Sequence, residues 1–361
     1  MKILEDEVRL DEDELRLCQA LLAGTNLKVK IKTIFSAPFE TTIGTPQGDG
    51  LSPILFVVYL ESAIREVMKR AEMKEIVRPA IDEGLPDKAI YADDSDFIST
   101  SESYLKGLEE LIPPTILEWD LMANPGKWER TKINVEEGEW KKVRKLGSLL
   151  GDEEDLDRRI GLASVQFKLL SKLWERGGKT SLDTRMRVYN AFVIPVLTYN
   201  ASTWGLTEAS VYKLEVYHRR HLRAIVGIVY PNRISNEELY KRCKAKPLGF
   251  VLRESRWRLF GHVMRMDQGT PAQKAMEYYC TAKECKQRGR ALTTLPVLLF
   301  NEFHAYKQSQ KKSSYRQKND VALRELRKLA KDRNGWKTIV QQVCRICNED
   351  PTYELSDSDD V

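Results

Sequence analysis

Two adjacent carboxylates, Asp93 and Asp94, are the residues of this sequence best suited to chemistry. The predicted short strands Lys88–Ala92 and Phe97–Ser99 lie on either side and close around the pair in a tight turn. Neighbouring carboxylates at such a turn repel each other unless a cation lies beside them. A divalent metal would supply that cation, and in-line phosphoryl or nucleotidyl transfer commonly uses two such ions. An Asp-Asp pair is also ordinary turn composition, so the pair alone does not decide between chemistry and structure.

A glycine-rich segment, Ile43–Gly50, lies upstream of the carboxylates and has three glycines and a proline in eight residues. This composition excludes regular structure, and the apolar sequence that follows predicts a helix from Leu51 to about Met73. A glycine-rich loop that runs into a helix lets a nucleobase and its phosphates approach backbone N–H groups. The alternative is a simple helix entry, which explains the glycines but not the whole segment.

In this order, the motifs resemble those of reverse transcriptases of the non-LTR (LINE-like) retrotransposon type. The segment Gly44–Pro53 (GTPQGDGLSP) resembles motif B of that family, and Tyr91–Asp94 (YADD) resembles motif C. Asn124–Glu129 resembles motif D, although tryptophan stands at position 128 where the family usually has threonine. Lys145–Gly151 resembles motif E, the primer grip, and Arg256–Arg265 resembles a segment common in the downstream region of these element-encoded proteins.

The resemblance implies an RNA-directed DNA polymerase, a nucleotidyltransferase that extends a DNA primer with dNTPs along an RNA template. It implies that Asp93 is a catalytic ligand of Mg²⁺, or of Mn²⁺ in its place, and that Asp94 supports the same metal site. Gln47 and Gly48 would line the pocket for the template base and the incoming nucleotide.

The resemblance also assigns roles to residues of motifs D and E. Lys127 would lie near the triphosphate, where a cation stabilises the negative charge that develops on the leaving pyrophosphate. Leu146, Gly147 and Ser148 would hold the end of the primer.

Motif A of the family, a strand that ends in Phe-Asp or a close variant, supplies a third carboxylate and belongs just before Met1. No segment here replaces it, since Asp6, Asp11 and Asp13 lie in a predicted acidic helix without an apolar strand beside it. The fingers domain should precede motif A. We therefore expect an N-terminally truncated reverse transcriptase with weakly bound or absent metal. It should have little activity alone, because loss of one member of a catalytic set costs orders of magnitude in rate.

Two other functions remain compatible with these residues. One is a non-catalytic remnant of such an element that binds RNA or DNA, and the other is a helical interaction protein without a nucleic-acid role. The charge distribution bears on this choice. Residues 1–20 carry −4 and residues 349–361 carry −6, so residues 21–348 carry +15. A body this basic suits a phosphate backbone, although a solvated Lys/Arg surface explains the charge as well.

The expected fold class is α+β and predominantly helical. A partial right-hand polymerase palm, made of a small antiparallel sheet with helices, would precede a helical thumb and a helical C-terminal extension. The expected organisation is an acidic helix (1–24), the partial palm (25–151), the thumb and connection (152–268), a basic helical extension (269–348) and an acidic disordered tail (349–361).

Several features limit the function classes. The apolar runs are too short for a bilayer helix and the first residues do not resemble a secretory signal, so we expect an intracellular protein without a membrane partner. The six cysteines therefore read as reduced thiols. Cys344 and Cys347 have zinc-ligand spacing but no second pair follows them, which favours buried, helix-facing cysteines.

Two histidines, His218 and His221, lie three residues apart beside arginines on a predicted helix. A metal pair is one interpretation, and a basic helix face that contacts nucleic acid or solvent is the favoured one. Four tryptophans are interpreted as helix-packing core rather than as platforms for base stacking: Trp174, Trp204, Trp257 and Trp336.

Overall fold

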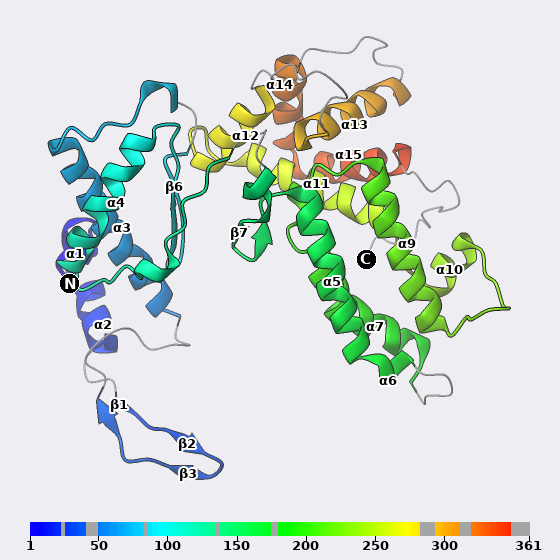
Figure 1. The fold of residues 1–361 in the computed structure, drawn as a ribbon, viewed down its shortest axis with the longest axis horizontal. Coiled ribbons are helices and arrows are strands. Elements are labelled where there is room, and N and C mark those ends of the chain that lie inside the picture. The colour runs from blue at the N-terminus through cyan, green and yellow to red at the C-terminus, as the bar shows by residue number, and fades with distance from the viewer. Residues whose placement is uncertain are drawn as a thin grey trace. The chain divides into compact units, whose positions relative to one another are not determined.

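The structure is a computed structural model that describes residues 1–22, 26–40, 50–82, 86–133, 138–174, 180–281, 293–310 and 319–347. Over these residues it is predominantly helical, with short two-stranded antiparallel sheets, which confirms the expected α+β class (Figure 1). The chain divides into two compact units, Met1–Glu129 and Arg130–Val361.

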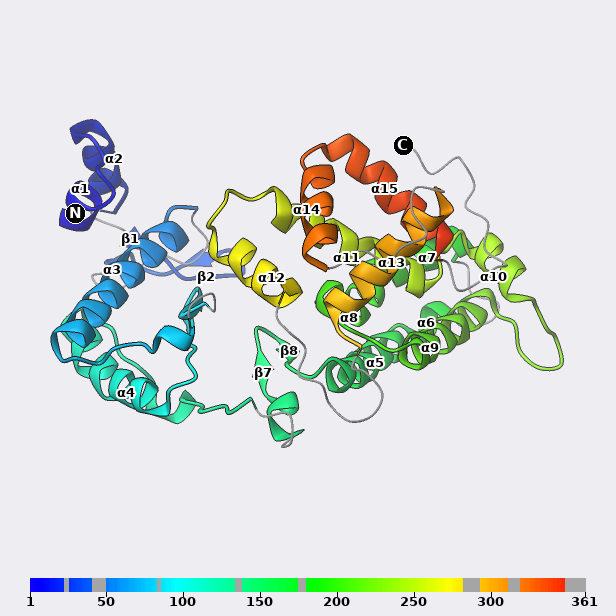
Figure 2. The ribbon, with the colours of Figure 1, turned by 90° about the horizontal axis from the view of Figure 1, so that it is seen from above.

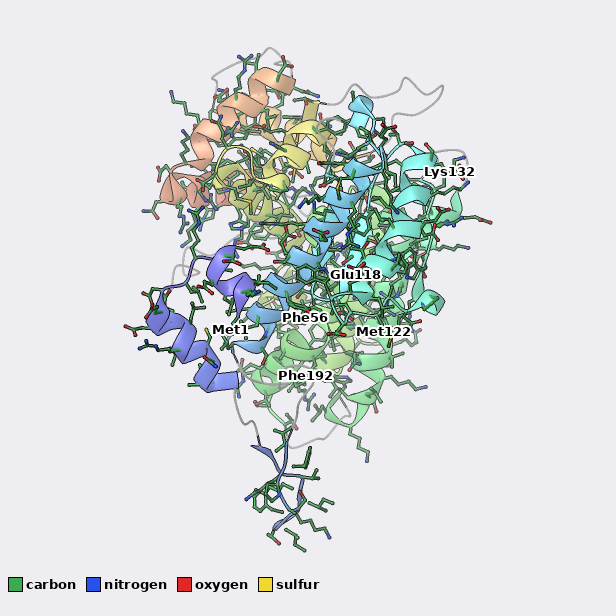
Figure 3. The ribbon with its side chains drawn as sticks, turned by 90° about the vertical axis from the view of Figure 1, so that its left-hand side faces the viewer. Met1, Phe56, Glu118, Met122, Lys132 and Phe192 are labelled. Carbon is green, nitrogen blue, oxygen red and sulfur yellow. The ribbon has the colours of Figure 1, made fainter. Side chains whose placement is uncertain are left out.

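The first unit is built around two long helices. Helix α3 (Ser52–Met73) carries Pro53 in its first turn, where a missing N–H costs nothing, and its bounds confirm the predicted helix. It packs against α4 (Glu102–Leu117), and Figure 3 shows the two helices side by side, with Phe56 and Glu118 labelled. The shared core contains Val67 and Ala71 of α3 and five apolar residues of α4: Tyr104, Leu108, Leu111, Ile112 and Ile116.

Helix α4 continues through Pro113 and Pro114, residues that commonly kink or break a helix, so the prolines do not break it. The packing gives the reason. Leu111, Ile112 and Ile116 on either side of the prolines are buried against α3, so the tertiary core holds the helix together at this point.

Shorter elements complete the first unit. Helices α1 (Lys2–Asp6) and α2 (Glu12–Leu22) occupy the region for which one acidic helix is expected. Strand β1 (Asn26–Leu27) pairs with β4 (Phe39–Glu40), and β2 (Lys30–Ile31) pairs with β3 (Ile34–Phe35). The single-turn helix η1 (Ala80–Asp82) precedes the hairpin of β5 (Lys88–Tyr91) and β6 (Asp94–Phe97), and η2 (Pro125–Lys127) follows α4.

The second unit begins with η3 (Gly138–Lys142) and the hairpin of β7 (Arg144–Lys145) and β8 (Ser148–Leu149). A series of helices follows, which Figure 2 shows from above: α5 (Asp152–Leu169), α6 (Ser171–Trp174), α7 (Leu182–Phe192), α8 (Ile194–Leu197), η4 (Ala201–Thr203), α9 (Glu208–Val226), α10 (Asn236–Cys243), α11 (Leu248–Arg265), α12 (Pro271–Thr281), α13 (Leu295–Ser309), α14 (Asn319–Ala330) and α15 (Arg333–Ile346).

The helices of this unit form two hydrophobic cores that share α11. The first core contains residues from each of the consecutive helices α5 through α10, and Leu248 and Leu252 of α11 also belong to it. The second core joins α11 to α13, α14 and α15, and Trp257 and Phe260 belong to it. The four tryptophans predicted to be core residues are all buried, which confirms that prediction.

The compact units divide after Glu129, whereas the sequence places the end of the palm after residue 151. The difference has a physical cause, because the β7–β8 hairpin is hydrogen-bonded to α5 and so belongs with the helices. The expected acidic tail, 349–361, lies outside the described residues. Among the described helices, none is both long enough and apolar enough to cross a bilayer.

Candidate functional site

The carboxylates Asp93 and Asp94 lie at the free end of the β5–β6 hairpin. The strands pair from Lys88 opposite Phe97 to Tyr91 opposite Asp94, which leaves Ala92 and Asp93 as a two-residue turn. Ala92 has a φ of 52°, as tight hairpin turns of this length require at one or both central positions. Both carboxylates are exposed, and neither makes a hydrogen bond or an ion pair with another described residue.

The base of this hairpin is fixed by a buried carboxylate, Asp82 of η1, whose side chain has no exposed surface. It accepts hydrogen bonds from Ser99 Oγ (2.5 Å), from Thr100 N (3.1 Å) and from Thr100 Oγ1 (2.6 Å). The hydrogen bond from Ser99, followed by the one from the Thr100 side chain, lowers the pKa of Asp82. The end of β6 is therefore anchored to η1.

Arg78 fixes the two flanks of the hairpin at the same level. Its guanidinium donates to the carbonyl oxygens of Pro86, which precedes β5, and Ile98, which follows β6, at 3.2 and 3.4 Å. Phe97, the last residue of β6, packs against the core of α3 and α4. The hairpin is thus rigidly held at its base, and its tip carries the exposed carboxylates about three residues, or roughly 10 Å, further out.

A third carboxylate, Asp96, was not singled out from the sequence. It follows Asp94 by two residues in the same strand, so both side chains lie on one face of the hairpin. Asp96 is half-buried and has an interaction of its own. The two-residue period of a strand is the sequence signal that could have indicated it.

Asp93 and Asp94 fit part of a magnesium site. Mg²⁺ is usually held by one or two carboxylates together with water and substrate phosphates, and these two side chains offer carboxylate oxygens that no other described residue binds. Within the described residues, no group of three or more His, Cys, Asp or Glu side chains is arranged to hold a metal ion. The hairpin tip therefore supplies a partial ligand set.

The residues of motifs B and D belong to the same unit as the hairpin. Gln47 and Gly48 lie outside the described residues. Asn124 accepts a hydrogen bond from Gly126 N at 3.0 Å and begins η2, which ends at the exposed Lys127. The preceding residues Leu121 and Ala123 pack on the core that also receives Phe97. One core thus supports the hairpin base and the motif D segment.

The motif E residues form the β7–β8 turn in the second unit. Leu146 and Gly147 have φ angles of 46° and 80°, and two positive values define the tight hairpin turn that favours glycine. The Leu146 side chain is 51% exposed, whereas Ser148 is buried. The carbonyl of Leu146 accepts a hydrogen bond from Tyr199 Oη at 2.9 Å.

Buried charges on α5 hold this turn. The carbonyl of Gly147 accepts hydrogen bonds from Arg158 at 2.8 Å and from Arg159, and Arg159 also donates to Ser148 Oγ at 3.0 Å. The Arg159 guanidinium lies over the Tyr199 ring, 4.3 Å from its centroid, and burial lowers the pKa of Arg159. The turn thus has its backbone acceptors occupied by the helical body.

Asp155 completes the network around Arg159. Its carboxylate is fully buried and accepts hydrogen bonds from Leu149 N (3.0 Å) and Trp204 Nε1 (3.3 Å), with Arg159 Nε at 3.6 Å. Sequence reasoning missed Asp155 and Arg159. The available signal was their spacing of four residues, which places them on one helix face and allows an ion pair.

His218 and His221 contradict the expected basic surface, because both are buried in the first core. His218 Nδ1 lies 3.0 Å from Tyr189 Oη, and the His221 ring stacks on Phe167 with 3.8 Å between ring centroids. Burial lowers the pKa of His218 to about 3 and that of His221 to about 4. They are neutral packing residues at physiological pH.

The two cysteines of the CxxC segment are part of the second core. Cys344 is buried, and burial raises the pKa of its thiol to about 12, which keeps it protonated. Cys347 is partly buried and packs against the same core. This arrangement confirms the predicted core role of Cys344.

Comparison with protein-family models, curated proteins and solved structures finds no match to this chain. The assignment of a function therefore rests on the residues and their geometry.

Proposed function

We propose that this chain comprises palm and thumb portions of a non-LTR retrotransposon reverse transcriptase, an RNA-directed DNA polymerase. The observation that carries the proposal is the Asp93–Asp94 pair, exposed at the tip of a hairpin whose base is fixed by Asp82 and Arg78. Carboxylates that have no partner among the described residues and lie on a hairpin with an anchored base suit a metal-dependent nucleotidyl transfer. The alternative, that two aspartates are simply common residues in a turn, does not explain why the base of the β5–β6 hairpin is anchored by Asp82 and Arg78.

The residues divide the work of such an enzyme between the two units. Asp93 and Asp94 would hold Mg²⁺, which when bound activates the attacking 3′-hydroxyl and neutralises charge on the leaving group. The exposed Lys127 would balance charge on the triphosphate. In the primer grip, the exposed Leu146 side chain would contact the primer end, while Ser148 would keep the turn in shape through Arg159.

The proposal includes incomplete catalysis by residues 1–361. No segment of this sequence resembles motif A, and two adjacent carboxylates cannot bridge two metals as three would. Removal of a member of a cooperating catalytic set usually lowers the rate by several orders of magnitude. We therefore expect slow, residual DNA synthesis from this chain by itself.

The second candidate is a non-catalytic remnant that binds nucleic acid. The charge of +15 on residues 21–348 favours it, because binding to a phosphate backbone needs no metal site. Both candidates share the nucleic-acid ligand and differ in whether nucleotides are joined.

Primer extension on an RNA template with Mg²⁺ or Mn²⁺ tests the proposal, with binding of the same primer–template measured in parallel. Incorporation that is lost in Asp93→Ala and retained in the exposed control Asp120→Ala supports the enzyme. Salt-sensitive binding without incorporation supports the remnant. Absence of both incorporation and salt-sensitive binding contradicts both candidates and leaves a helical interaction protein.

A further inference from the structure

A pocket of about 450 Å³ lies between α11 and α15 in the second unit. The residues from α11 repeat at intervals of three or four, as do those from α15, so one face of each helix forms a wall. The lining residues are Glu254, Arg258, His262 and Arg265 from α11 and Arg333, Trp336, Lys337, Val340 and Gln341 from α15.

The helices approach closely because α11 has a glycine at the crossing. A Cβ atom on Gly261 would lie 2.1 Å from Trp336 Nε1, so no other residue fits there without a shift of the helices. Trp336 is buried, and its indole N–H donates to the Trp257 carbonyl at 3.1 Å. The ring closes the inner side of the pocket and offers no exposed face on which a base could stack.

The pocket walls are strongly basic. Four lining side chains are cationic, and the one acidic residue, Glu254, is already bonded to Arg258 at 2.6 Å. The other three cations, Arg265, Arg333 and Lys337, form no ion pair with a described residue. Like charges that converge without a counter-charge repel each other, and an anion between them relieves that repulsion.

Arg265 carries the second indication of an anion. Its Nη1 donates to the Ala330 carbonyl at 3.2 Å, which fixes the guanidinium at the edge of the pocket. Its Nε is buried and has no hydrogen-bond partner among the described residues. Burial, together with the nearby charge of Arg333, lowers the pKa of Arg265.

We propose that the α11–α15 pocket binds the phosphodiester backbone of a nucleic-acid strand through Arg265, Arg333 and Lys337. Guanidinium groups hold phosphates by paired, charge-assisted hydrogen bonds, and lysine adds a point charge. Because the buried Trp336 presents no stacking surface, recognition is independent of base sequence. The pocket residues and Asp93 belong to different compact units, and the proposed binding does not depend on polymerase activity.

The test is the binding of a short fluorescein-labelled RNA strand to the full chain, measured by anisotropy between about 50 and 200 mM salt. The triple variant Arg265→Gln/Arg333→Gln/Lys337→Gln should bind at least about tenfold more weakly at the upper salt concentration. Each lost phosphate contact should also make the slope of log affinity against log salt less steep by about 0.7. The control triple Lys241→Gln/Arg242→Gln/Lys328→Gln removes the same charge from exposed positions outside the pocket and should leave the slope unchanged.

Equal weakening by the two triples would overturn the proposal, since only general charge would then matter. The double variant Arg333→Gln/Lys337→Gln keeps the partly buried Arg265 and so remains informative if the triple variant folds poorly. Its slope of log affinity against log salt should become less steep by about 1.4, which corresponds to two lost phosphate contacts. A competition experiment with inorganic pyrophosphate tests whether the ligand is a strand or a small polyphosphate. Displacement of RNA by equimolar pyrophosphate would identify a small polyphosphate as the ligand and overturn the assignment to a strand.

Discussion

The two compact units each present a hairpin that carries predicted site residues, and the two hairpins are held in opposite ways. In β5–β6 the base is anchored, by Asp82 to Thr100 and by Phe97 in the core, while the tip carries exposed carboxylates. In β7–β8 the turn itself is anchored, because the carbonyls of Leu146 and Gly147 accept hydrogen bonds from the helical body.

The difference separates groups that are available to a ligand from groups that maintain a shape. Carboxylates without described partners, at the tip of a hairpin anchored at its base, can exchange water for a cation without breaking a described interaction. The turn carbonyls of β7–β8 cannot, because that of Leu146 already accepts from Tyr199 and that of Gly147 from Arg158 and the buried Arg159. These hydrogen bonds belong to the network that stabilises the turn around Asp155. Substitutions in the two hairpins should therefore have opposite consequences, with large effects on stability in one and large effects on ligand binding in the other.

The largest expected effect on stability is that of Asp155→Ala. It removes a fully buried carboxylate and leaves Arg159, also buried, without its partner, which costs about 3–5 kcal/mol in comparable buried pairs. The free energy of unfolding, measured by urea denaturation, should fall by this amount. Asp157→Ala on the same helix is the matched control, since its ion pair with Lys213 is exposed and contributes at most about 1 kcal/mol. Similar losses for the two variants would contradict the buried network.

The contrast between Asp155 and Asp157 also shows what the sequence could and could not predict. Both are acidic residues in the first turns of a helix with an acidic start, and local pattern treats them alike. Asp155 is buried because Trp204 and Leu149, distant in the sequence from each other, close over it. Such burial depends on tertiary contacts that have no periodic signal.

Elements with strong local signals were predicted well. The helix expected from Leu51 to Met73 is α3. Ser181 and Ser235 are of a residue type that commonly caps helices, and they accept hydrogen bonds from Thr184 N and Glu238 N. The hairpin around Asp93 was predicted with a different second strand, because the turn closes after one carboxylate and Asp94 already belongs to β6. His218 and His221 were misplaced for the same reason as Asp155: neighbouring arginines suggested a surface, and packing decided otherwise.

The buried histidines should make the stability of the second unit, but not that of the first, sensitive to mildly acidic pH. All four histidines of the chain lie in the second unit. The unfolded chain gains protons on His218 and His221 below about pH 6.5, whereas the folded pKa values are about 3 and 4. Stability of the second unit should therefore fall as the pH falls through this window. At pH 5, which lies above both folded pKa values, the loss should reach about 2 kcal/mol for each histidine.

Urea denaturation at pH 7 and pH 5, followed by tryptophan fluorescence, measures this loss. His221→Phe keeps an aromatic ring against Phe167 and should reduce the dependence on pH. His262→Gln, at an exposed position of α11, should leave the dependence unchanged. An unaltered pH dependence in His221→Phe would show that carboxylates, rather than this buried histidine, cause the acid sensitivity.

The smallest expected effect on stability is at the free tip, in Asp93→Asn and Asp94→Asn. Exposed side chains without described partners change the free energy of unfolding by about 0.5 kcal/mol or less, and removal of one of two adjacent like charges opposes any loss.

The same variants should have the largest effect on cation binding, because the tip supplies only two carboxylates. Paramagnetic Mn²⁺ should broaden the backbone amide signals of residues 91–96 at a concentration on the order of millimolar, as weak oxygen-ligand sites require. Each variant should abolish this broadening, whereas Asp120→Asn, an exposed aspartate of the same unit, should preserve it. Broadening that persists in the double variant Asp93→Asn/Asp94→Asn would show that the cation binds to other groups. The exposed carboxylates at the β5–β6 tip would then not distinguish this hairpin from β7–β8 as the one that binds metal.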